Sequence, residues 1–520
     1  MAIVEQNDPG NSHQHVNATT PSTSSTSQKA LVIGAGPSGL VTAKYLLAST
    51  NPRYEVTILE ASGAIGGTFV NKVYDNARLV SSKFITGFSD FRMKEDYPDH
   101  PSATEYVEYL DDYAQRFGII ECIKFGCSVV SLKDNPCNER ENDVEGTNAC
   151  TSTGGASTSD VAEDSPLMTK IKGQLDGEEL AVDANGYIVS YHEKCKSSQQ
   201  QDHHDVQLIT EHFDVVAVCS GLHNIPSIPT LPSSSTFKGQ IIHSSQYKES
   251  SIFTNKRVLV LGSGETAMDI ALRAIQNPQS QSVALNVRRG FLSIPHNLAE
   301  DRPLDVFITN LFEHSYEHPW VHKLRLRWVL STIVIRLFLV LTGSSVGFNQ
   351  WACETTPIRR GYHIINKSHG AMSHLNVPIK QKSLWGRLWL WIYGEAKLRP
   401  MASFHRTSVC GIKDDGVTVE FDDGREYEAD LIVLATGYKQ SFPFLDEAIQ
   451  EDHRRTANVP KKGSTSKYFL EEDYLPSDHF IINKQRPRLS FIGFVRPNVG
   501  ASELIIIKTS RLEDLHLSLI

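Results

Sequence analysis

The stretch LVIGAGPSGL, residues 31–40, decides the fold that we expect. An apolar strand leads into Gly34, Gly36 and Gly39, which have the G-x-G-x-x-G spacing of a dinucleotide-binding turn, and a helical pattern follows. Gly34 permits a tight turn, Gly36 lets the backbone approach a pyrophosphate, and Gly39 lets the helix pack on the strand. The phosphate would lie at the helix start, beside Ser38, where unpaired N–H groups favour negative charge.

The nucleotide expected at this first site is FAD. The next apolar stretch, YEVTILE, ends in Glu60, 26 residues after Gly34. A carboxylate at this place accepts hydrogen bonds from both ribose hydroxyls of an adenosine. A second glycine-rich turn, SGAIGGTF (62–69), follows, and we expect its Gly66 and Gly67 near the continuing flavin pyrophosphate.

A second copy of the motif, RVLVLGSGETAMDIA, occupies residues 257–271. Gly262 and Gly264 open it, and Ala267, a small residue that the pattern accepts, stands at the third glycine position. We expect Ser263 and Thr266 to complete this second nucleotide-binding turn.

The coenzyme expected at the second site is NADPH. Arg288 lies 26 residues after Gly262, the spacing that separates Gly34 from Glu60, and Arg289 follows it. Arginine binds a ribose 2′-phosphate through charge-assisted hydrogen bonds, whereas a carboxylate would repel it. The alternative is that the two arginines are only the solvated end of a strand.

Composition and cysteine usage restrict the class of protein. A net charge of -9 argues against a nucleic-acid partner, because such partners select basic surfaces. None of the eight cysteines forms a C-x-x-C pair, so we predict no metal site. Two nucleotide sites imply electron transfer from nicotinamide to flavin, which leaves disulfide reductases, oxidases, quinone reductases and monooxygenases. Cys122 and Cys127 lie far from the first glycines, which disfavours a redox pair and hence the first class.

The segment FKGQIIHSSQYK, residues 237–248, discriminates between the remaining classes. It resembles the signature F-x-G-x-x-x-H-x-x-x-(Y/F)-K of the flavin-containing monooxygenases at every fixed position. The matching residues, which we expect at the cofactor site, are Phe237, Gly239, His243, Tyr247 and Lys248. Similarity to the family extends over most of residues 30–130, 205–300 and 395–501.

The resemblance implies a reaction in which the cofactors carry most of the chemistry. In the family the reduced flavin reacts with O2, and bound NADP⁺ shields it from water until a substrate arrives. The resemblance also implies that Val129 lies against the flavin adenine. No general-base triad is needed, and we assign no catalytic residue.

The chain departs from the family at two places. Members carry an asparagine just before the S/T-S-K run, where its amide supports the flavin after reaction with O2, and Val80 stands there in this chain. Ser81 or Ser82 could replace the amide through a hydroxyl or a bound water. The residues after Ala501 differ from the usual ending, which predicts either loosened flavin binding or an altered terminus in this isoform.

The expected fold class is α/β, with two Rossmann-like dinucleotide-binding domains and an apolar helical insertion. The FAD domain is interrupted by the NADPH domain, and the chain then returns to complete the first. The predicted boundaries are a disordered tail at 1–28, FAD domain 29–236 with a polar insertion at 134–186, NADPH domain 237–427 with an apolar insertion at 313–393, and FAD domain again at 428–520. Strand-like runs at both ends of the polar insertion predict a hairpin with a lengthened connection.

The apolar run at 328–348 has nearly the length to cross a bilayer. It could lie at a membrane interface, as the similar aromatic run at 384–394 would, span the membrane, or form a buried helix over a substrate tunnel. The N-terminus has no apolar secretory core, so we expect a location on the cytoplasmic side, at an endoplasmic reticulum-like membrane if 328–348 binds lipid.

The function favoured by these features is insertion of one oxygen atom from O2 into a lipophilic small molecule, with NADPH as reductant. The target would be a nitrogen, a sulfur or an activated carbon of a secondary metabolite. One alternative is an NADPH oxidase or reductase that releases peroxide because Val80 leaves the flavin unprotected. The other is a degenerate flavoprotein with a binding role.

Overall fold

The structure is a computed structural model that describes part of the chain. It covers residues 27–135, 185–194, 206–288, 291–293, 399–405, 407–439, 441–450 and 486–494, and short pieces between 297 and 393 and at 482–483. The predicted tail and polar insertion fall outside these residues except at their edges. The first strand begins at Gln28, so the first domain starts one residue before the predicted boundary.

The first domain is built on a six-stranded sheet in the order β23-β24-β7-β1-β2-β3. All its pairings are parallel except that between β23 and β24. The strands are β1 (Gln28–Ile33), β2 (Tyr54–Glu60), β3 (Ile123–Phe125), β7 (Val215–Val218), β23 (Ile482–Asn483) and β24 (Arg486–Phe491). Because β24 pairs with β7, the expected return of the chain to the first domain is confirmed.

Alternate residues of β1 enter two different cores. Ala30 and Val32 pack with helices α1 (Pro37–Ala48) and α4 (Ala103–Arg116) on one face. Leu31 and Ile33 pack on the other face against a three-stranded antiparallel sheet. That sheet consists of β4 (Cys127–Asp134), β5 (Tyr187–Lys194) and β6 (Val206–Phe213). Since β4 and β5 pair antiparallel around the polar insertion, the predicted hairpin with a lengthened connection is confirmed.

The second domain repeats this plan on a fully parallel five-stranded sheet in the order β17-β11-β10-β21-β9. Its core on one face contains helices α6 (Glu265–Gln276) and α10 (His369–Leu375), and the other face packs on a small antiparallel sheet. The strands are β9 (Gln240–His243), β10 (Arg257–Leu261), β11 (Ser282–Val287), β17 (Ala402–His405) and β21 (Leu431–Leu434) in the main sheet, and β18 (Val409–Ile412), β19 (Thr418–Phe421) and β20 (Glu426–Glu428) in the small one.

Short elements complete the described residues. They are α2 (Thr68–Asn71), α3 (Lys83–Thr86), α12 (Leu384–Tyr393), η1 (Ile120–Cys122), η2 (Ser234–Thr236), η3 (Ser244–Gln246), η4 (Ser250–Phe253), β8 (Ile225–Pro226), β12 (Phe291–Ser293), β13 (Asn297–Leu298), β14 (Arg302–Pro303), β15 (Trp351–Ala352), β16 (Ile365–Asn366) and β22 (Tyr438–Lys439). The α/β fold with two parallel-sheet domains is therefore confirmed.

The predicted domain boundary at residue 428 is wrong. Strand β21 pairs with β10 and β9, so it belongs to the second sheet and not to the returning first domain. The chain leaves the second domain only after β21, through Gly437 and β22. A short apolar strand that is buried on both faces carries no sequence signal that says which of two parallel sheets it joins.

The predicted apolar helical insertion at 313–393 is not supported as a separate unit. Of its residues that the structure describes, Ala371, Met372 and Leu375 on α10 lie in the core of the second domain with α6. Most of the run at 328–348 lies outside the described residues. Within the described part of the chain, we find no helix with both the length and the apolar character needed to traverse a bilayer.

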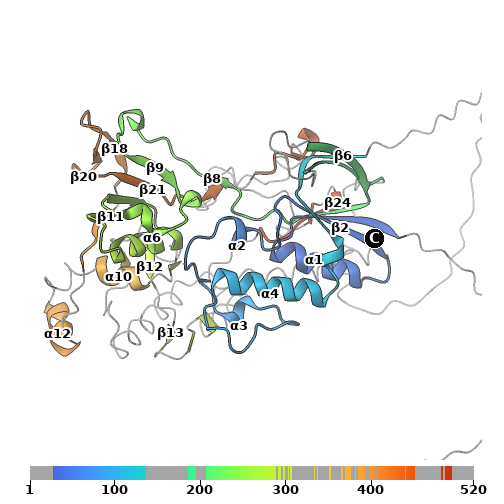
Figure 1. Ribbon diagram of the computed structural model, residues 1–520, viewed down its shortest axis with the longest axis horizontal. Coiled ribbons are helices and arrows are strands. Elements are labelled where there is room, and N and C mark those ends of the chain that lie inside the picture. The colour runs from blue at the N-terminus through green and yellow to red at the C-terminus, as the bar shows by residue number, and fades with distance from the viewer. Residues whose placement is uncertain are drawn as a thin grey trace, which may run out of the picture.

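The two domains form two lobes that are joined by a two-stranded ribbon (Figure 1). The outgoing linker contains β8 and the returning linker contains β22, and these strands pair antiparallel. Ser227 N–H donates to Gly437 O at 2.9 Å and Thr436 Oγ1 donates to Ser227 O at 2.5 Å. The described linkers therefore cross between the lobes as one hydrogen-bonded unit.

Candidate functional site

The first glycine-rich loop forms an open cradle at the start of α1. Gly34 has a φ of +107°, and a Cβ there would lie 2.8 Å from Cys219 O, so this turn requires glycine. A Cβ at Gly39 would lie 1.9 Å from Gly34 O, which explains the close packing of helix on strand. A Cβ at Gly36 would meet nothing within 4 Å, and no side chain caps the N–H groups at this helix start. The loop therefore fits a pyrophosphate group.

Glu60 lies at the carboxyl end of β2 beside this loop, as predicted. Its Oε2 accepts from Ala35 N–H at 2.7 Å, and its Oε1 accepts from Ser62 N–H and Ser62 Oγ at 2.8 and 2.7 Å. The side chain is only 6% exposed, so these bonds hold the carboxylate in one position. A carboxylate oxygen accepts more than one bond, and the site thus fits an adenosine ribose.

The second glycine-rich turn lies against the first. Gly66 N–H donates to Ala35 O at 3.1 Å, and Gly66 and Gly67 both have positive φ, at +122° and +55°. A Cβ at Gly67 would lie 3.5 Å from Gly36 Cα, and Gly67 is the residue before α2. The two turns therefore line one continuous backbone surface, which agrees with the predicted path of a flavin pyrophosphate.

Gly493, which belongs to neither glycine-rich motif, approaches this surface from the returning chain. It follows β24 with a φ of +86°, and a Cβ there would lie 2.1 Å from Ser38 Oγ in the first turn of α1. A single glycine inside an apolar strand pattern carries no sequence signal for such an approach.

Val129, assigned to the adenine by resemblance, lies half-buried on β4. The preceding Gly126 N–H donates to Ser62 O at 3.0 Å, which joins the start of β4 to the loop that holds Glu60. This placement is compatible with the adenine assignment, which stays a prediction.

The second glycine-rich loop repeats the cradle at the start of α6. Gly262 has a φ of +149°, and a Cβ there would lie 2.3 Å from Ala435 O. Gly264 faces open space within 4 Å, and no side chain caps the start of α6. Ala267 is fully buried at the third glycine position, while Thr266 is exposed and Ser263 half-buried. The loop fits a second pyrophosphate.

Arg288 does not occupy the same place in its domain as Glu60 does in the first, as equal spacing had predicted. In the first sheet Ile33 pairs with Leu59, but in the second Leu261 pairs with Asn286. The position equivalent to Glu60 is therefore the buried Val287, and Arg288 lies one residue further, exposed in the bend after β11. Arg289 lies outside the described residues.

This shift leaves a basic side chain at the ribose edge of the second site. The side chain of Val287 has no acceptor for a ribose hydroxyl, and the exposed Arg288 follows it directly. A nucleotide with a charged ribose substituent extends further from the loop than one with a bare ribose. The geometry is therefore compatible with a 2′-phosphate contact.

The signature residues at 237–248 are structural in this conformation. His243 is 2% exposed at the carboxyl end of β9, and its Nδ1 accepts from Ser245 N–H at 3.2 Å. Its Nε2 therefore carries the proton and donates to Gly437 O at 3.0 Å in the returning linker. Burial lowers the pKa of His243, which keeps the ring neutral. This histidine joins β9 to the ribbon between the domains.

The other signature residues also make packing or domain contacts. A Cβ at Gly239 would lie 2.4 Å from Asp430 O, and the Phe237 ring lies against the same position. Tyr247 is fully buried, with its ring stacked on Phe253 at 5.3 Å between centroids. Lys248 donates to two carbonyls of the first domain. Within the described structure these residues make packing and domain contacts, and the hydrogen bonds of Lys248 are with the first domain rather than with the glycine-rich loops.

The Val80 region offers no hydroxyl in place of the family's amide. Val80 is 37% exposed. Ser81 Oγ pairs with Thr86 Oγ1 at 2.7 Å, and Ser82 Oγ is buried without a hydrogen-bond partner. Ser82 N–H donates to the buried Asp305 of the second domain at 2.6 Å.

Cys122 and Cys127 do not form a disulfide in this structure. Cys122 and Cys127 are both free, and burial raises the pKa of each. With both thiols protonated, the structure does not support a disulfide reductase.

Two uncapped glycine-rich cradles, one with a carboxylate and one with an arginine beside the expected ribose, fit a class of protein with two dinucleotide sites. The model of the flavin-binding monooxygenase-like family matches residues 27–170 and 185–331. The chain belongs to this family of monooxygenases, and it is thus an oxidoreductase of flavoprotein type.

Curated relatives agree with this membership. The chain is 30% identical to "Monooxygenase ptmN" of Penicillium ochrochloron over 91% of its own length and 71% of that protein. It is 27% identical to flavin-containing monooxygenase 1 of Rattus norvegicus, over 90% of this chain and 70% of that protein.

Solved structures share the fold. A flavin-containing monooxygenase from Stenotrophomonas maltophilia matches 95% of this chain and 98% of its own, at a TM-score of 0.52 and 13% identity. S-allyl-L-cysteine S-oxygenase from Allium sativum matches 94% of this chain and 77% of its own, at 0.52 and 17%.

Proposed function

We propose that the protein is an NADPH-dependent monooxygenase that binds FAD and transfers one oxygen atom of O2 to a lipophilic small molecule. The contrast between Glu60 and Arg288 carries the proposal. A carboxylate at the first ribose edge suits the unsubstituted ribose of FAD, whereas an exposed arginine at the second suits a 2′-phosphate.

The division of labour follows from this arrangement. FAD, when bound, supplies the redox chemistry with nicotinamide and O2. Glu60 and the glycine-rich loops would hold the adenosine and pyrophosphate, and Arg288 would select the coenzyme. The two cradles belong to different domains. The ribbon that joins the domains would therefore influence the distance between the two bound nucleotides.

The target atom is proposed from the relatives. The Allium sativum neighbour is named an S-oxygenase, and several curated relatives are named monooxygenases of fungal origin. We propose a nitrogen, sulfur or activated carbon of a secondary metabolite as the oxygen acceptor. We further propose that residues 328–348 support membrane association on the cytoplasmic side, where lipophilic substrates concentrate.

One assay tests the oxygenase proposal. NADPH and O2 consumption are measured with and without candidate sulfides, amines and ketones, and hydrogen peroxide is measured beside them. We expect consumption to yield oxygenated product with little peroxide. Consumption that yields only peroxide with every substrate would instead identify an NADPH oxidase.

The oxidase alternative rests on Val80 and its neighbours. The side chain of a valine has no hydrogen-bond donor, and the hydroxyls of Ser81 and Ser82 are paired or buried. Replacing Val80 by Asn should lower the ratio of peroxide formed to NADPH consumed. Val80→Leu, which adds bulk without a donor, is the matched control and should not lower this ratio.

A further inference from the structure

A six-residue segment of the first domain, Asn71–Asn76, is hydrogen-bonded to the second domain, and we call this segment the strap. Lys248 of the second domain donates from Nζ to the carbonyls of Asn71 and Val73 at 3.1 and 3.2 Å. In return, Asp75 N–H donates to Lys248 O at 2.8 Å. Bonds from both the side chain and the backbone of Lys248 therefore fix the strap against the chain just before η4.

Helix α6 forms hydrogen bonds with the other part of the strap. The Tyr74 hydroxyl donates to Asp269 Oδ2 at 2.6 Å, and Arg273 Nε donates to the same oxygen at 3.0 Å. Arg273 also donates to Asn76 O at 2.8 Å and lies 5.2 Å from the centre of the Tyr74 ring. Asp269 and Arg273 are one turn apart on α6, so one face of this helix holds the strap.

The contact is largely removed from water. The Tyr74 ring lies 5.1 Å from that of the fully buried Tyr247, and the Arg273 side chain is 17% exposed. Burial and the adjacent Asp269 carboxylate raise the pKa of Tyr74, so its hydroxyl stays a donor. Hydrogen bonds to a charged group in such surroundings are stronger than those on an open surface.

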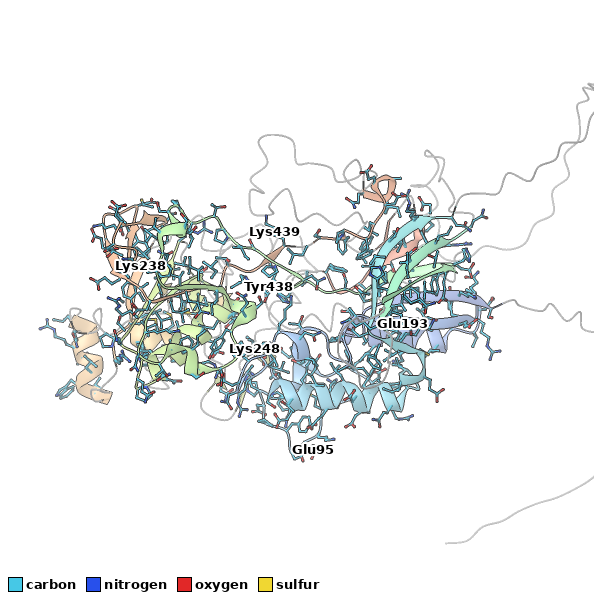
Figure 2. The ribbon with its side chains drawn as sticks, turned by 45° about the horizontal axis from the view of Figure 1, so that its top comes forward. Glu95, Glu193, Lys238, Lys248, Tyr438 and Lys439 are labelled. Carbon is cyan, nitrogen blue, oxygen red and sulfur yellow. The ribbon has the colours of Figure 1, made fainter. Side chains whose placement is uncertain are left out.

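Lys72, which also lies in the strap, connects the strap to the ribbon. Its Nζ donates to the carbonyls of His223 and Asn224 in the outgoing linker, and it lies 4.5 Å from the centre of the Tyr438 ring in the returning linker. Figure 2 shows Tyr438 and Lys248 between the two lobes. The strap thus contacts both linkers and the second domain.

The strap connects the two nucleotide cradles through short rigid elements. Gly67, in the first cradle, immediately precedes α2, and the strap begins at the last residue of that helix. Asp269 and Arg273 lie on α6, which begins directly after Gly264 of the second cradle. A shift at the strap therefore moves one cradle relative to the other.

We propose that Tyr74, Asp269 and Arg273 are positioning residues that fix the distance between the two bound nucleotides, and thereby set the rate of flavin reduction. The inference rests on the proposed use of NADPH and FAD. It assigns these residues no contact with either nucleotide. Reaction rates fall steeply when reacting groups are misplaced, by as much as about 100-fold for 1 Å.

The test compares Tyr74→Phe, which removes only the hydroxyl, and Arg273→Lys with the control Arg486→Lys. Arg486 pairs with Asp134 inside the first domain, so the control makes the same exchange of Arg for Lys in a similar ion pair without touching the strap. At saturating NADPH without O2, we expect the rate constant of flavin reduction to fall about tenfold in both strap variants. FAD content and the Kd for NADPH should stay unchanged, as should every value in the control.

Small-angle X-ray scattering gives a readout that is independent of activity. The strap variants should show a larger radius of gyration than the wild type and the control, because helix α6 then holds the strap less firmly. Unchanged scattering with an unchanged reduction rate overturns the proposal, as does loss of FAD in proportion to the rate. If the wild type itself is not reduced by NADPH, the proposed function fails, and the scattering comparison alone then decides the role of the strap.

Discussion

At the scale of residues, the two cradles differ most where they would touch a ribose. Glu60 is fixed by three hydrogen bonds from Ala35 and Ser62, whereas Arg288 is exposed at the end of its strand. A fixed carboxylate is pre-organised for one ribose, and a flexible cation adapts to a phosphate that arrives with the coenzyme. The two glycine-rich loops are therefore alike, and the residues beside the expected riboses differ in charge.

Coenzyme choice should depend on Arg288. A charge-assisted contact is worth on the order of 1.5–3 kcal/mol, or roughly 10- to 150-fold in affinity. Arg288→Ala should raise the Michaelis constant for NADPH by about that factor and leave NADH nearly unchanged, as steady-state kinetics would show. Arg425→Ala, an arginine in a turn of the small antiparallel sheet, is the control. Equal weakening of both coenzymes would contradict the 2′-phosphate assignment.

Gly36 and Gly264 both face open space, so the same substitution can be made in each loop to test its ligand. A Cβ at Gly36 or Gly264 meets nothing within 4 Å, so each chain can accommodate Asp without a clash. The carboxylate then repels the pyrophosphate. Gly36→Asp should purify without yellow FAD absorbance, whereas Gly264→Asp should keep its FAD and lose affinity for NADPH. Full flavin content in Gly36→Asp would refute the first assignment.

At the scale of elements, both glycine-rich loops, the strand before each and the helix after each were predictable from sequence. Tight turns and helix starts are encoded locally, by Gly34, Gly36 and their counterparts. Strand partnership is not local, and β21 was therefore assigned to the wrong sheet. Register is not local either. The elements from Gly34 to Glu60 and from Gly262 to Arg288 have equal spacing, yet their strands pair one residue apart.

The signature at 237–248 shows another limit of sequence. The signature identified the family, but in the structure its residues contact the ribbon and the first domain. Phe237 and Gly239 pack at the start of β9, and His243 joins its end to Gly437. A recurring motif reports that residues are needed together, without saying whether they contact a ligand.

The histidine at the end of β9 should make stability depend on pH. Burial lowers the pKa of His243 from its usual 6.5, so the unfolded state binds a proton more readily. Its contribution is present above pH 6.5 and is lost as the pH falls from there through the lower folded-state pKa. The Tm should drop by a few degrees over this range. His243→Asn, which keeps an acceptor for Ser245 N–H, should show a smaller drop, and an equal drop would exclude this origin.

At the scale of the whole molecule, the described part of the chain is two copies of one plan. Each has a parallel sheet with helices on one face and a small antiparallel sheet on the other (Figure 1). The four buried clusters divide between the domains, two in each, without a shared member. The described contacts between the lobes are those of the ribbon and the strap and the bond from Ser82 N–H to Asp305, and Tyr74 of the strap also packs against the core of the second domain.

Separate cores predict that the two domains unfold as two units, and that FAD raises the unfolding temperature of only one of them. A ligand stabilises only the unit that binds it, by about 2.7 kcal/mol at 100 times its Kd. Differential scanning calorimetry of the protein stripped of FAD should resolve two transitions, and added FAD should raise only the one that belongs to the first domain. NADP⁺ should raise the other, since α6 and the second cradle lie in the second domain. A single transition that either ligand shifts as a whole would mean that the ribbon and the strap couple the domains into one cooperative unit.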